Sequence, residues 1–283
     1  MPIGAHVSTS GGLSRAVQRA EALGAECMQI FLAPPQRWGP ANHRDEEVQA
    51  FVRQMLAARI GPNFAHARYL INLASAEPKV RQRSMNALAA CAEWAQRCRL
   101  DGVVLHVGSA LGQPTDEAER QVASSLREVL DRSGSARILL ENSAGSGHTL
   151  GARFKQIGAL LDRLERDPRL EVCLDTAHAF ASGYDLRTDD GLAQMLAEIK
   201  RYVGVDRLRL IHANDSRATL GSAVDRHENI GLGLLGEQSF RRMLAHPVLA
   251  HLPWVLEVPG FANKGPDEPN VRALKRLAGR PGS

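Results

Sequence analysis

The chain has 283 residues, of which 44% are hydrophobic and 23% charged, and its formal net charge is +4. This length suits one large domain, and no run of about 18 apolar residues is present to cross a membrane. The four cysteines form no Cys-x-x-Cys pair, which argues against a thiolate zinc site. We therefore expect a soluble, cytoplasmic protein without a signal peptide, and its mildly basic charge permits an anionic partner without requiring one.

Short apolar segments alternate with amphipathic segments from one end of the chain to the other. The segments with strand character are Ile3–Val7, Met28–Leu32, Asn63–His66, Val103–Val107, Ile138–Glu141, Val172–Asp175, Leu208–His212 and Val255–Val258. The segments with helical periodicity are Leu13–Leu23, Asp45–Arg59, Val80–Arg99, Asp116–Leu130, Ala152–Arg166, Leu192–Val203, Ser239–Leu249 and Asn270–Leu277. Eight strands that each precede a helix predict an α/β fold, a single (β/α)8 TIM barrel, which needs about 250 residues.

No linker rich in glycine, serine or proline divides the chain, so we expect one domain over residues 1–283, with 279–283 as a flexible tail. The alternative architecture is an open doubly wound sheet. That fold needs a Gly-x-Gly-x-x-Gly turn after its first strand, and Gly11-Gly12 lacks this spacing.

Metal-binding side chains follow six consecutive predicted strands. The carboxyl ends of the strands of a barrel meet at one face, so residues far apart in sequence converge there. The first predicted strand also ends near a histidine, His6, for which a supporting and a structural role both stay open. The nine candidate ligands are His66, His106, Glu141, Asp175, His178, His212, Asp225, His227 and Glu257.

This set of imidazoles and carboxylates suits Zn²⁺, Mn²⁺ or a similar divalent ion. A single histidine at a strand end is more often a hydrogen-bonded core residue, and a single buried carboxylate usually pairs with arginine. Nine such groups at one barrel mouth are costly if unpaired, and chance pairing does not account for all of them. Because one zinc takes about four ligands, shared carboxylates would let the set hold two or three ions.

Clustered ions can activate water and neutralise the oxygens of a phosphoryl group, which favours phosphoester hydrolysis. A two-metal sugar isomerase on a related barrel is the alternative. Such an enzyme usually needs fewer ligands and a lysine or histidine for proton transfer, and no lysine lies at a predicted strand end.

Four segments of the chain resemble the endonuclease IV family of apurinic/apyrimidinic (AP) endonucleases, and the resemblance extends over nearly the whole chain. They are IGAHVSTSGGL, YLINL, CLDTAHAFASGYDLRT and HANDSRATLGSAVDRHENIGLG. The resemblance implies a hydrolase, a DNA repair endonuclease that cuts the phosphodiester 5′ to abasic sites and leaves a 3′-hydroxyl and a 5′-deoxyribose phosphate. It also implies trimming of blocked 3′ ends.

The resemblance further implies three zinc ions that activate a hydroxide, with Mn²⁺ as an alternative in some sites. The first ion would be held by His66, His106 and Glu141. The catalytic Glu141 would bridge to a second ion, completed by Asp175, His212 and Glu257. The third ion would be held by His178, Asp225 and His227. This third group disfavours the isomerase, and the intact ligand set disfavours a DNA-binding protein with a damaged site.

The implied partner is double-stranded DNA containing abasic sites or blocked 3′ ends, bound by a monomer without a membrane or an organic cofactor. Tyr69 and Leu70 match the residues that fill the gap left by the extruded nucleotide, although they could merely pack their loop. Arg226 is also expected to contact DNA.

Three positions depart from the family pattern. The usual arginine of a Pro-Arg-x-Trp motif is Gln36 here, with Arg37 beside it. The lysine after Asn-Asp-Ser is Arg217, and the frequently charged residue between two glycines is Leu232. We expect these changes to affect DNA affinity and not the metal chemistry.

Overall fold

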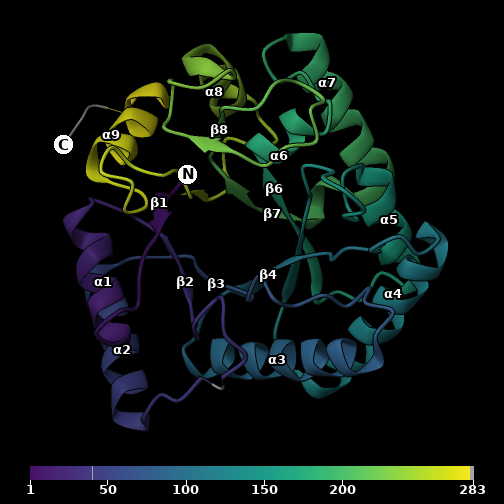
Figure 1. Cartoon of the computed structure of the whole chain (residues 1–283). Helices are drawn as coiled ribbons and strands as arrows, with labels where there is room; N and C mark the ends of the chain where they lie inside the picture. The colour runs from purple at the N-terminus through teal and green to yellow at the C-terminus, as the bar shows by residue number, and fades with distance from the viewer. Residues whose placement is uncertain (40, 281–283) are drawn as a thin grey trace.

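Eight parallel strands close into a barrel in the computed structural model, which describes residues 1–39 and 41–280. The helices form an outer ring around the strands (Figure 1). The barrel strands are β1 (Ile3–His6), β2 (Met28–Phe31), β3 (Asn63–His66), β4 (Gly102–His106), β5 (Ile138–Glu141), β6 (Leu170–Asp175), β7 (Leu208–His212) and β10 (Trp254–Leu256). The sheet closes where β1 pairs with β10, with Ile3 opposite Trp254 and Ala5 opposite Leu256.

The helices fill the connections between the strands. They are α1 (Leu13–Ala22), α2 (Asp45–Ala58), α3 (Pro78–Arg97), α4 (Thr115–Arg132), α5 (Phe154–Arg163), α6 (Thr176–Ala181), α7 (Asp189–Glu198), α8 (Gly236–Ala245) and α9 (Glu268–Leu277). A π-helical turn, Ile199–Val203, continues α7, and a short 3₁₀ turn, Val205–Arg207, leads into β7. The (β/α)8 prediction is confirmed, and the open doubly wound alternative is wrong because the sheet has no free edge.

Two parts of the fold differ from the sequence-based prediction. The short helix α6 follows β6 directly, and the carboxylate of Asp175 caps it by accepting from the backbone N–H of His178 at 2.7 Å. A small antiparallel pair, β8 (Asp215–Ser216) and β9 (His227–Glu228), forms between β7 and α8. Both features lie at the carboxyl end of the barrel and place loop residues over its mouth.

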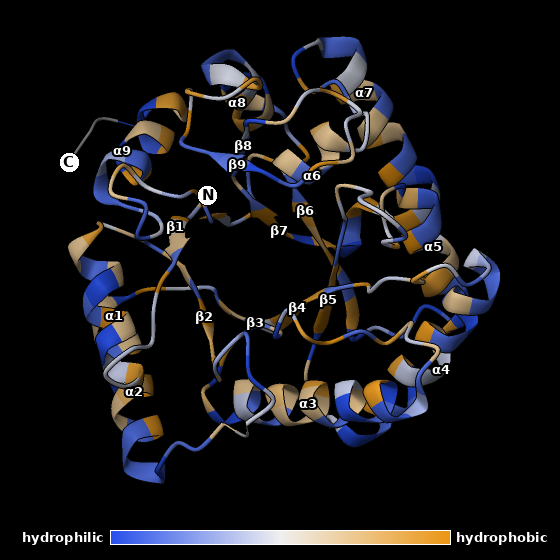
Figure 2. Cartoon of the chain, in the orientation of Figure 1, coloured by the Kyte–Doolittle hydropathy of each residue, from blue (hydrophilic) through white to orange (hydrophobic). Residues whose placement is uncertain are grey.

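The core has two layers, because successive side chains of a strand point to opposite faces. The outward side chains pack against the helices, whose hydrophilic residues alternate with hydrophobic ones in Figure 2. The inward side chains form a separate apolar cluster of Cys27, Phe64, Val104, Leu139, Cys173, Leu210 and Val255. On β1 the same level is occupied by Gly4, where a Cβ would lie 1.7 Å from the carbonyl oxygen of Cys27. This layer closes the barrel below the residues that end each strand.

The first and last described residues of the chain meet beneath this layer. The guanidinium of Arg280 donates to the Glu26 carboxylate at 2.7 Å and to the carbonyl of Met1 at 3.3 Å. Residues 281–283, which belong to the predicted flexible tail, lie outside the described residues. No helix among the described residues combines the length and the apolar character needed to span a membrane.

Candidate metal centre

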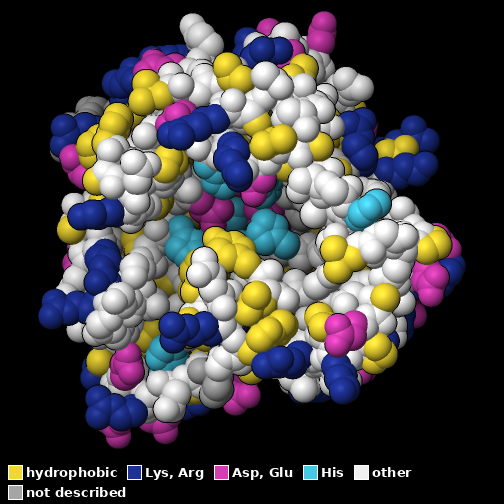
Figure 3. Space-filling view, viewed as in Figure 1, with side chains coloured by type: hydrophobic (Ala, Val, Ile, Leu, Met, Phe, Trp, Pro, Cys, Tyr) yellow, Lys and Arg dark blue, Asp and Glu magenta, His cyan; other side chains and the backbone are white. Residues whose placement is uncertain are grey.

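A ring of polar side chains lies two residues further along the strands than the apolar layer, on the side of the barrel mouth. Each member follows an inward apolar residue or Gly4 by two positions, so it too faces the interior. Figure 3 shows the result as histidine and acidic side chains gathered at the centre of the barrel mouth. Seven members lie in barrel strands and Glu257 directly follows β10; the ring consists of His6, Gln29, His66, His106, Glu141, Asp175, His212 and Glu257.

Three groups of potential ligands overlap in this ring. In each group, one nitrogen or oxygen atom per residue lies within 4.8 Å of the others. Glu141 belongs to the first and second groups, and Asp175 to the second and third, so two carboxylates connect all three. The groups are His66–His106–Glu141, Glu141–Asp175–His212–Glu257 and Asp175–His178–His227.

Glu141 is fully buried at the centre of the ring. One carboxylate oxygen, Oε2, lies 3.4 Å from Nε2 of His66 and 3.6 Å from Nε2 of His106. The other, Oε1, lies 3.1 Å from Nδ1 of His212. Burial alone would raise the pKa of Glu141, but the charges of His106 and His212 hold that pKa well below its usual range. Glu141 is therefore an anion that two neighbouring cation sites can share.

Asp225 lies over the third group without belonging to it. Its carboxylate oxygens are each 3.2 Å from Nε2 of one histidine, His178 and His227. Asp175 completes the third group, with Oδ2 3.7 Å from His227 Nε2, and the role that the resemblance implies for Asp225 stays a prediction. The side chain of Asp225 is half exposed, so it lies on the solvent side of these histidines.

Backbone carbonyls and one side-chain amide accept from ring nitrogens of the candidate ligand histidines. A histidine held in this way presents its other nitrogen in a fixed direction, as metal-ligating histidines almost always do. The four bonds run from His66 Nδ1 to Ala67 O (2.6 Å), His178 Nδ1 to Asn142 O (2.9 Å), His227 Nδ1 to Glu257 O (3.3 Å) and His212 Nε2 to Gln29 Oε1 (3.0 Å).

The donor set fits divalent metal ions. Nε2 of His227 is buried, and Asp225 Oδ1, although 3.2 Å away, lies outside hydrogen-bonding geometry, so this nitrogen makes no hydrogen bond among the described residues. Burial alone would lower the pKa of His227, but the combined effect of Asp225 and Asp175 outweighs burial and raises this pKa to about 9. A buried nitrogen without a hydrogen bond, directed at carboxylates, has the surroundings of a metal ligand. All nine predicted ligands meet at this mouth, and their roles as ligands stay predictions.

Three amide side chains that support the ring were not predicted from the sequence. Gln29 is fully buried and contacts His6, His212 and Glu257. Asn142 and Asn214 both bond to Asp175: Asn142 accepts from its N–H at 2.7 Å, and Asn214 donates to its Oδ2 at 2.7 Å. The signal for the two asparagines was available, because Asn142 follows Glu141 directly and Asn214 comes two residues after His212.

The predicted wedge residues lie in the loop after β3. The side chain of Tyr69 is 57% exposed, and its ring centroid lies 5.7 Å from that of His66 and 5.3 Å from that of Phe31. Leu70 is half-buried beside it. The aromatic ring thus stands at the edge of the first ligand group with one side open to solvent.

The other predicted DNA contacts are exposed on neighbouring loops. Gln36 and Arg37 follow β2, and Arg226 lies between β8 and β9, where it donates to the carbonyl of Asp225. Arg217 is paired with Glu228 across the β8–β9 ladder, and Leu232 is 62% exposed. Their role in DNA binding stays a prediction.

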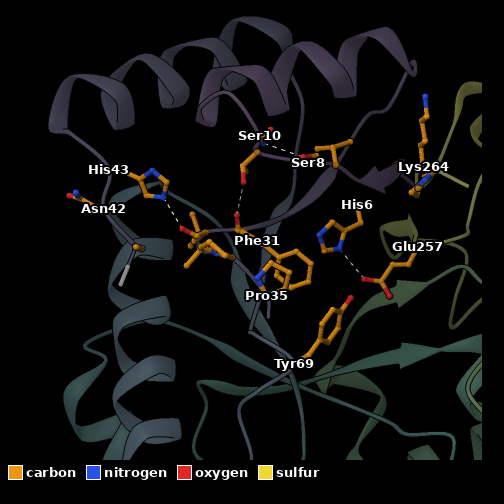
Figure 4. A pocket seen from close by; sticks show the side chains of 18 of the residues that line it. His6, Ser8, Ser10, Phe31, Pro35, Asn42, His43, Tyr69, Glu257 and Lys264 are labelled. Atoms are coloured by element: carbon orange, nitrogen blue, oxygen red, sulfur yellow. Dashed lines mark hydrogen bonds and ion pairs between the residues drawn. The ribbon is translucent and has the colours of Figure 1, made fainter. Parts of the chain in front are cut away.

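A cavity of about 760 Å³ opens beside the ring (Figure 4). The loops after β1, β2 and β10 form its walls, and Tyr69, His6 and Glu257 border it on the side of the metal centre. In Figure 4 the ring of His6 points to Glu257, and Nδ1 lies 3.1 Å from Oε1. The cavity is therefore continuous with the edge of the second ligand group.

Comparisons with known proteins find relatives over nearly the whole chain. The family model described as "Xylose isomerase-like TIM barrel" matches residues 17–278. A relative called "Probable endonuclease 4", from Nitratidesulfovibrio vulgaris strain DP4, is 40% identical over 283 residues, which cover 99% of this chain and all of the relative. The solved endonuclease IV from Thermus thermophilus is 34% identical, with a TM-score of 0.85 over 98% of both chains.

A more distant solved structure shares the fold alone. The D-psicose 3-epimerase of Clostridium cellulolyticum H10 is 14% identical, with a TM-score of 0.66 over 98% of this chain and 96% of that one. At this identity the likeness extends to the barrel and does not carry the epimerase reaction to this chain.

Proposed function

Because the chain belongs to the endonuclease IV family of AP endonucleases, a family of DNA-cleaving hydrolases, we propose that it hydrolyses the phosphodiester 5′ to abasic sites in duplex DNA. The products are a 3′-hydroxyl and a 5′-deoxyribose phosphate, and the same site trims blocked 3′ ends. The observation that carries this proposal is the set of three ligand groups connected through Glu141 and Asp175 at one barrel mouth.

We assign three ions to this mouth, zinc in the first instance, with Mn²⁺ as an alternative in some positions. His66 and His106 hold one ion with Glu141, and the second uses Glu141 with Asp175, His212 and Glu257. The third ion is held by His178, Asp225 and His227, and Asp175 lies close enough to contribute. Bound ions of this kind lower the pKa of water and neutralise charge on a phosphoryl group.

The charge of the ring explains why phosphate chemistry here needs cations. Four carboxylates meet at the mouth: those of Glu141, Asp175, Asp225 and Glu257. Burial alone would raise the pKa of Glu257, but His212 and His6 hold that pKa below its usual range, so Glu257 is an anion at neutral pH. These carboxylates would repel a phosphodiester, and without ions the raised pKa values of His178, His212 and His227 leave protons on the candidate ligands. Divalent ions would replace these protons, offset the carboxylate charge and make the mouth attractive to the substrate.

The loops supply the DNA contacts in this proposal. The exposed ring of Tyr69 enters the groove together with Leu70 and fills the space left by the extruded abasic nucleotide. Gln36, Arg37 and Arg226 contact the phosphate backbone from the loops on either side of the mouth. One chain acts alone in this arrangement, without an organic cofactor.

The test uses a duplex oligonucleotide with one tetrahydrofuran abasic analogue. We expect zinc-loaded protein to cut 5′ to the analogue, and chelation followed by zinc addition to remove and restore the cut. The same duplex with an intact nucleotide is the substrate control. Full activity in protein shown to contain no metal, or no cleavage by protein with three bound ions, would contradict the proposal.

A further inference from the structure

Gln29 and His6 are the two members of the inward ring that belong to none of the three ligand groups, and Gln29 is 0% exposed. We propose that Gln29 is a positioning residue of the metal centre, which fixes the ring of His212 and the carboxylate of Glu257 relative to each other. This inference rests on the proposed metal centre, since both partners belong to its second ligand group.

The orientation of the Gln29 amide follows from its partners. Its nitrogen Nε2 lies 2.6 Å from Oε1 of Glu257, and a carboxylate oxygen can only accept, so this end donates. The oxygen Oε1 is therefore the end that lies 3.0 Å from Nε2 of His212, and an amide oxygen can only accept. His212 must carry its proton on Nε2.

This bond decides which nitrogen of His212 is available to an ion. With Nε2 donating to Gln29, the other nitrogen, Nδ1, faces the cluster, 3.1 Å from Oε1 of Glu141 and 3.2 Å from Oε2 of Glu257. The amide thus holds the histidine ring by one end and Glu257 by the other. It sets both the direction of the nitrogen ligand and the position of one carboxylate oxygen.

Gln29 contacts both His212 and Glu257, whereas its neighbour in the ring, His6, contacts Glu257. Around the barrel, β1 and β10 separate β2 from β7, so the side chain extends across two strands to touch His212. His6 on β1 also contacts Oε1 of Glu257, at 3.1 Å, as Figure 4 shows. No hydrogen bond among the described residues joins His6 to His212. Gln29 therefore connects His212 and Glu257 through a second route, beside their direct contact of 3.2 Å.

A role in core packing would not require an amide at this level. The inward residue two positions earlier is Cys27, which directly precedes β2 and belongs to the apolar cluster. An apolar side chain in place of Gln29 would fill the same space but leave the N–H of His212 buried and unpaired. The amide therefore serves the ring above the core and not the core itself.

The test compares Gln29→Met with Gln29→Glu. Methionine keeps the length and volume but removes both hydrogen bonds. Glutamate keeps an acceptor for His212 and loses the donor to Glu257. Gln96→Met on α3 is the matched control, since Gln96 donates to the backbone of Ser133 far from the mouth. All four proteins, wild type included, are loaded with zinc and dialysed against graded chelator, and the bound zinc is counted.

Two further measurements separate positioning from folding. The first is the NMR signal of the imidazole Nε2–H of His212 in zinc-loaded, ¹⁵N-labelled protein. A hydrogen bond to this proton protects it from exchange with water and keeps the signal visible. The second is the unfolding midpoint of each protein without and with zinc, because an ion that binds only the folded state raises this midpoint. A residue that only supported the fold would lower the zinc-free midpoint and leave the zinc-induced rise unchanged.

We expect Gln29→Met to lose one of three zinc ions at a chelator concentration roughly 10- to 100-fold below that needed for wild type. The His212 Nε2–H signal should disappear in Gln29→Met and persist in Gln29→Glu, and Gln96→Met should match wild type. Retention of three ions by Gln29→Met at the wild-type chelator midpoint would overturn the inference alone. If Gln29→Met fails to fold, loss of the Nε2–H signal in Gln29→Glu overturns it instead. A wild-type protein that binds no zinc would overturn both this inference and the proposed function.

Discussion

The carboxylate of Asp215 organises the segment between β8 and α8, which carries His227 of the third ligand group. Asp215 is fully buried in β8 and accepts hydrogen bonds from five backbone N–H groups at 2.8–3.4 Å. The donors are Ser216, Gly231, Gly233, Leu235 and Gly236. The strand next to it, β9, begins at His227, so this network holds one predicted ligand over the mouth.

The substitution Asp215→Asn tests how much this network contributes. Asparagine has the same shape, but one oxygen becomes an NH₂ group that faces donors. Oδ1 accepts from Ser216 and Leu235, and Oδ2 from Gly231 and Gly233, so either orientation of the amide leaves at least two buried N–H groups without an acceptor. At about 1–3 kcal/mol for each unpaired group, the free energy of unfolding should fall by about 2–6 kcal/mol.

Urea unfolding of the zinc-free proteins measures this loss, and chelator titration measures its effect on the site. We expect Asp215→Asn to release the ion held by His178 and His227 before the others. The control is Asp190→Asn in the exposed first turn of α7, which should stay within about 0.5 kcal/mol of wild type. An Asp215→Asn protein as stable as this control would refute the reasoning, because five charge-assisted bonds would then contribute nothing.

Three further predictions concern the reaction, the DNA contact and the pH dependence of stability. Glu141→Gln should lower kcat for abasic-site cleavage by at least about 100-fold, since it removes the charge shared by two ligand groups, and unchanged kcat would contradict that role. Tyr69→Ala should weaken binding of the abasic duplex roughly 10- to 100-fold in a titration by fluorescence anisotropy while Tyr69→Phe does not, because the contact depends on the ring; equal effects of both would argue against a wedge. Burial alone would raise the pKa of Glu26, but hydrogen bonds from Arg280 and Ile3 hold it below the usual value, so its stabilising effect is present above about pH 4 and is lost as the pH falls through the lowered pKa. The difference in thermal unfolding midpoint between wild type and Glu26→Gln should thus be largest at neutral pH and disappear in acid, and a difference that grew in acid would show that the sign is wrong.

The barrel could be predicted from sequence because its signal repeats. Eight apolar segments of strand length each precede a helix, and all eight strands lie where the pattern placed them, to within a few residues. The resemblance to the endonuclease IV family is confirmed by the full-length relatives. Shorter features were not predicted, because α6 has six residues and β8 and β9 have two each, too few for a periodicity to register.

The candidate site was predictable where residue type alone indicates a ligand, and not where a residue acts through a neighbour. Histidines and acids at strand ends are conspicuous in the sequence. Gln29 lies inside the apolar segment Met28–Phe31 and resembles a core position until the closed barrel brings it within 3.0 Å of His212. The contacts of Asp225 with His178 and His227 also depend on the path of the loop between β8 and β9, which the sequence does not reveal.

The contact between Arg280, Glu26 and Met1 has a practical consequence for using this protein. It joins the described ends of the chain at the amino-terminal side of the barrel, where Trp254 also bonds to the carbonyl of Pro2 at 2.9 Å. The barrel mouth with the candidate ligands lies at the opposite side. A fusion partner, an affinity tag or a tether to a surface attached beside Met1 or Arg280 would therefore start on the side of the barrel away from this mouth. A short peptide that joins the two ends would also allow new termini to be opened in a loop away from the mouth, without stretching the barrel.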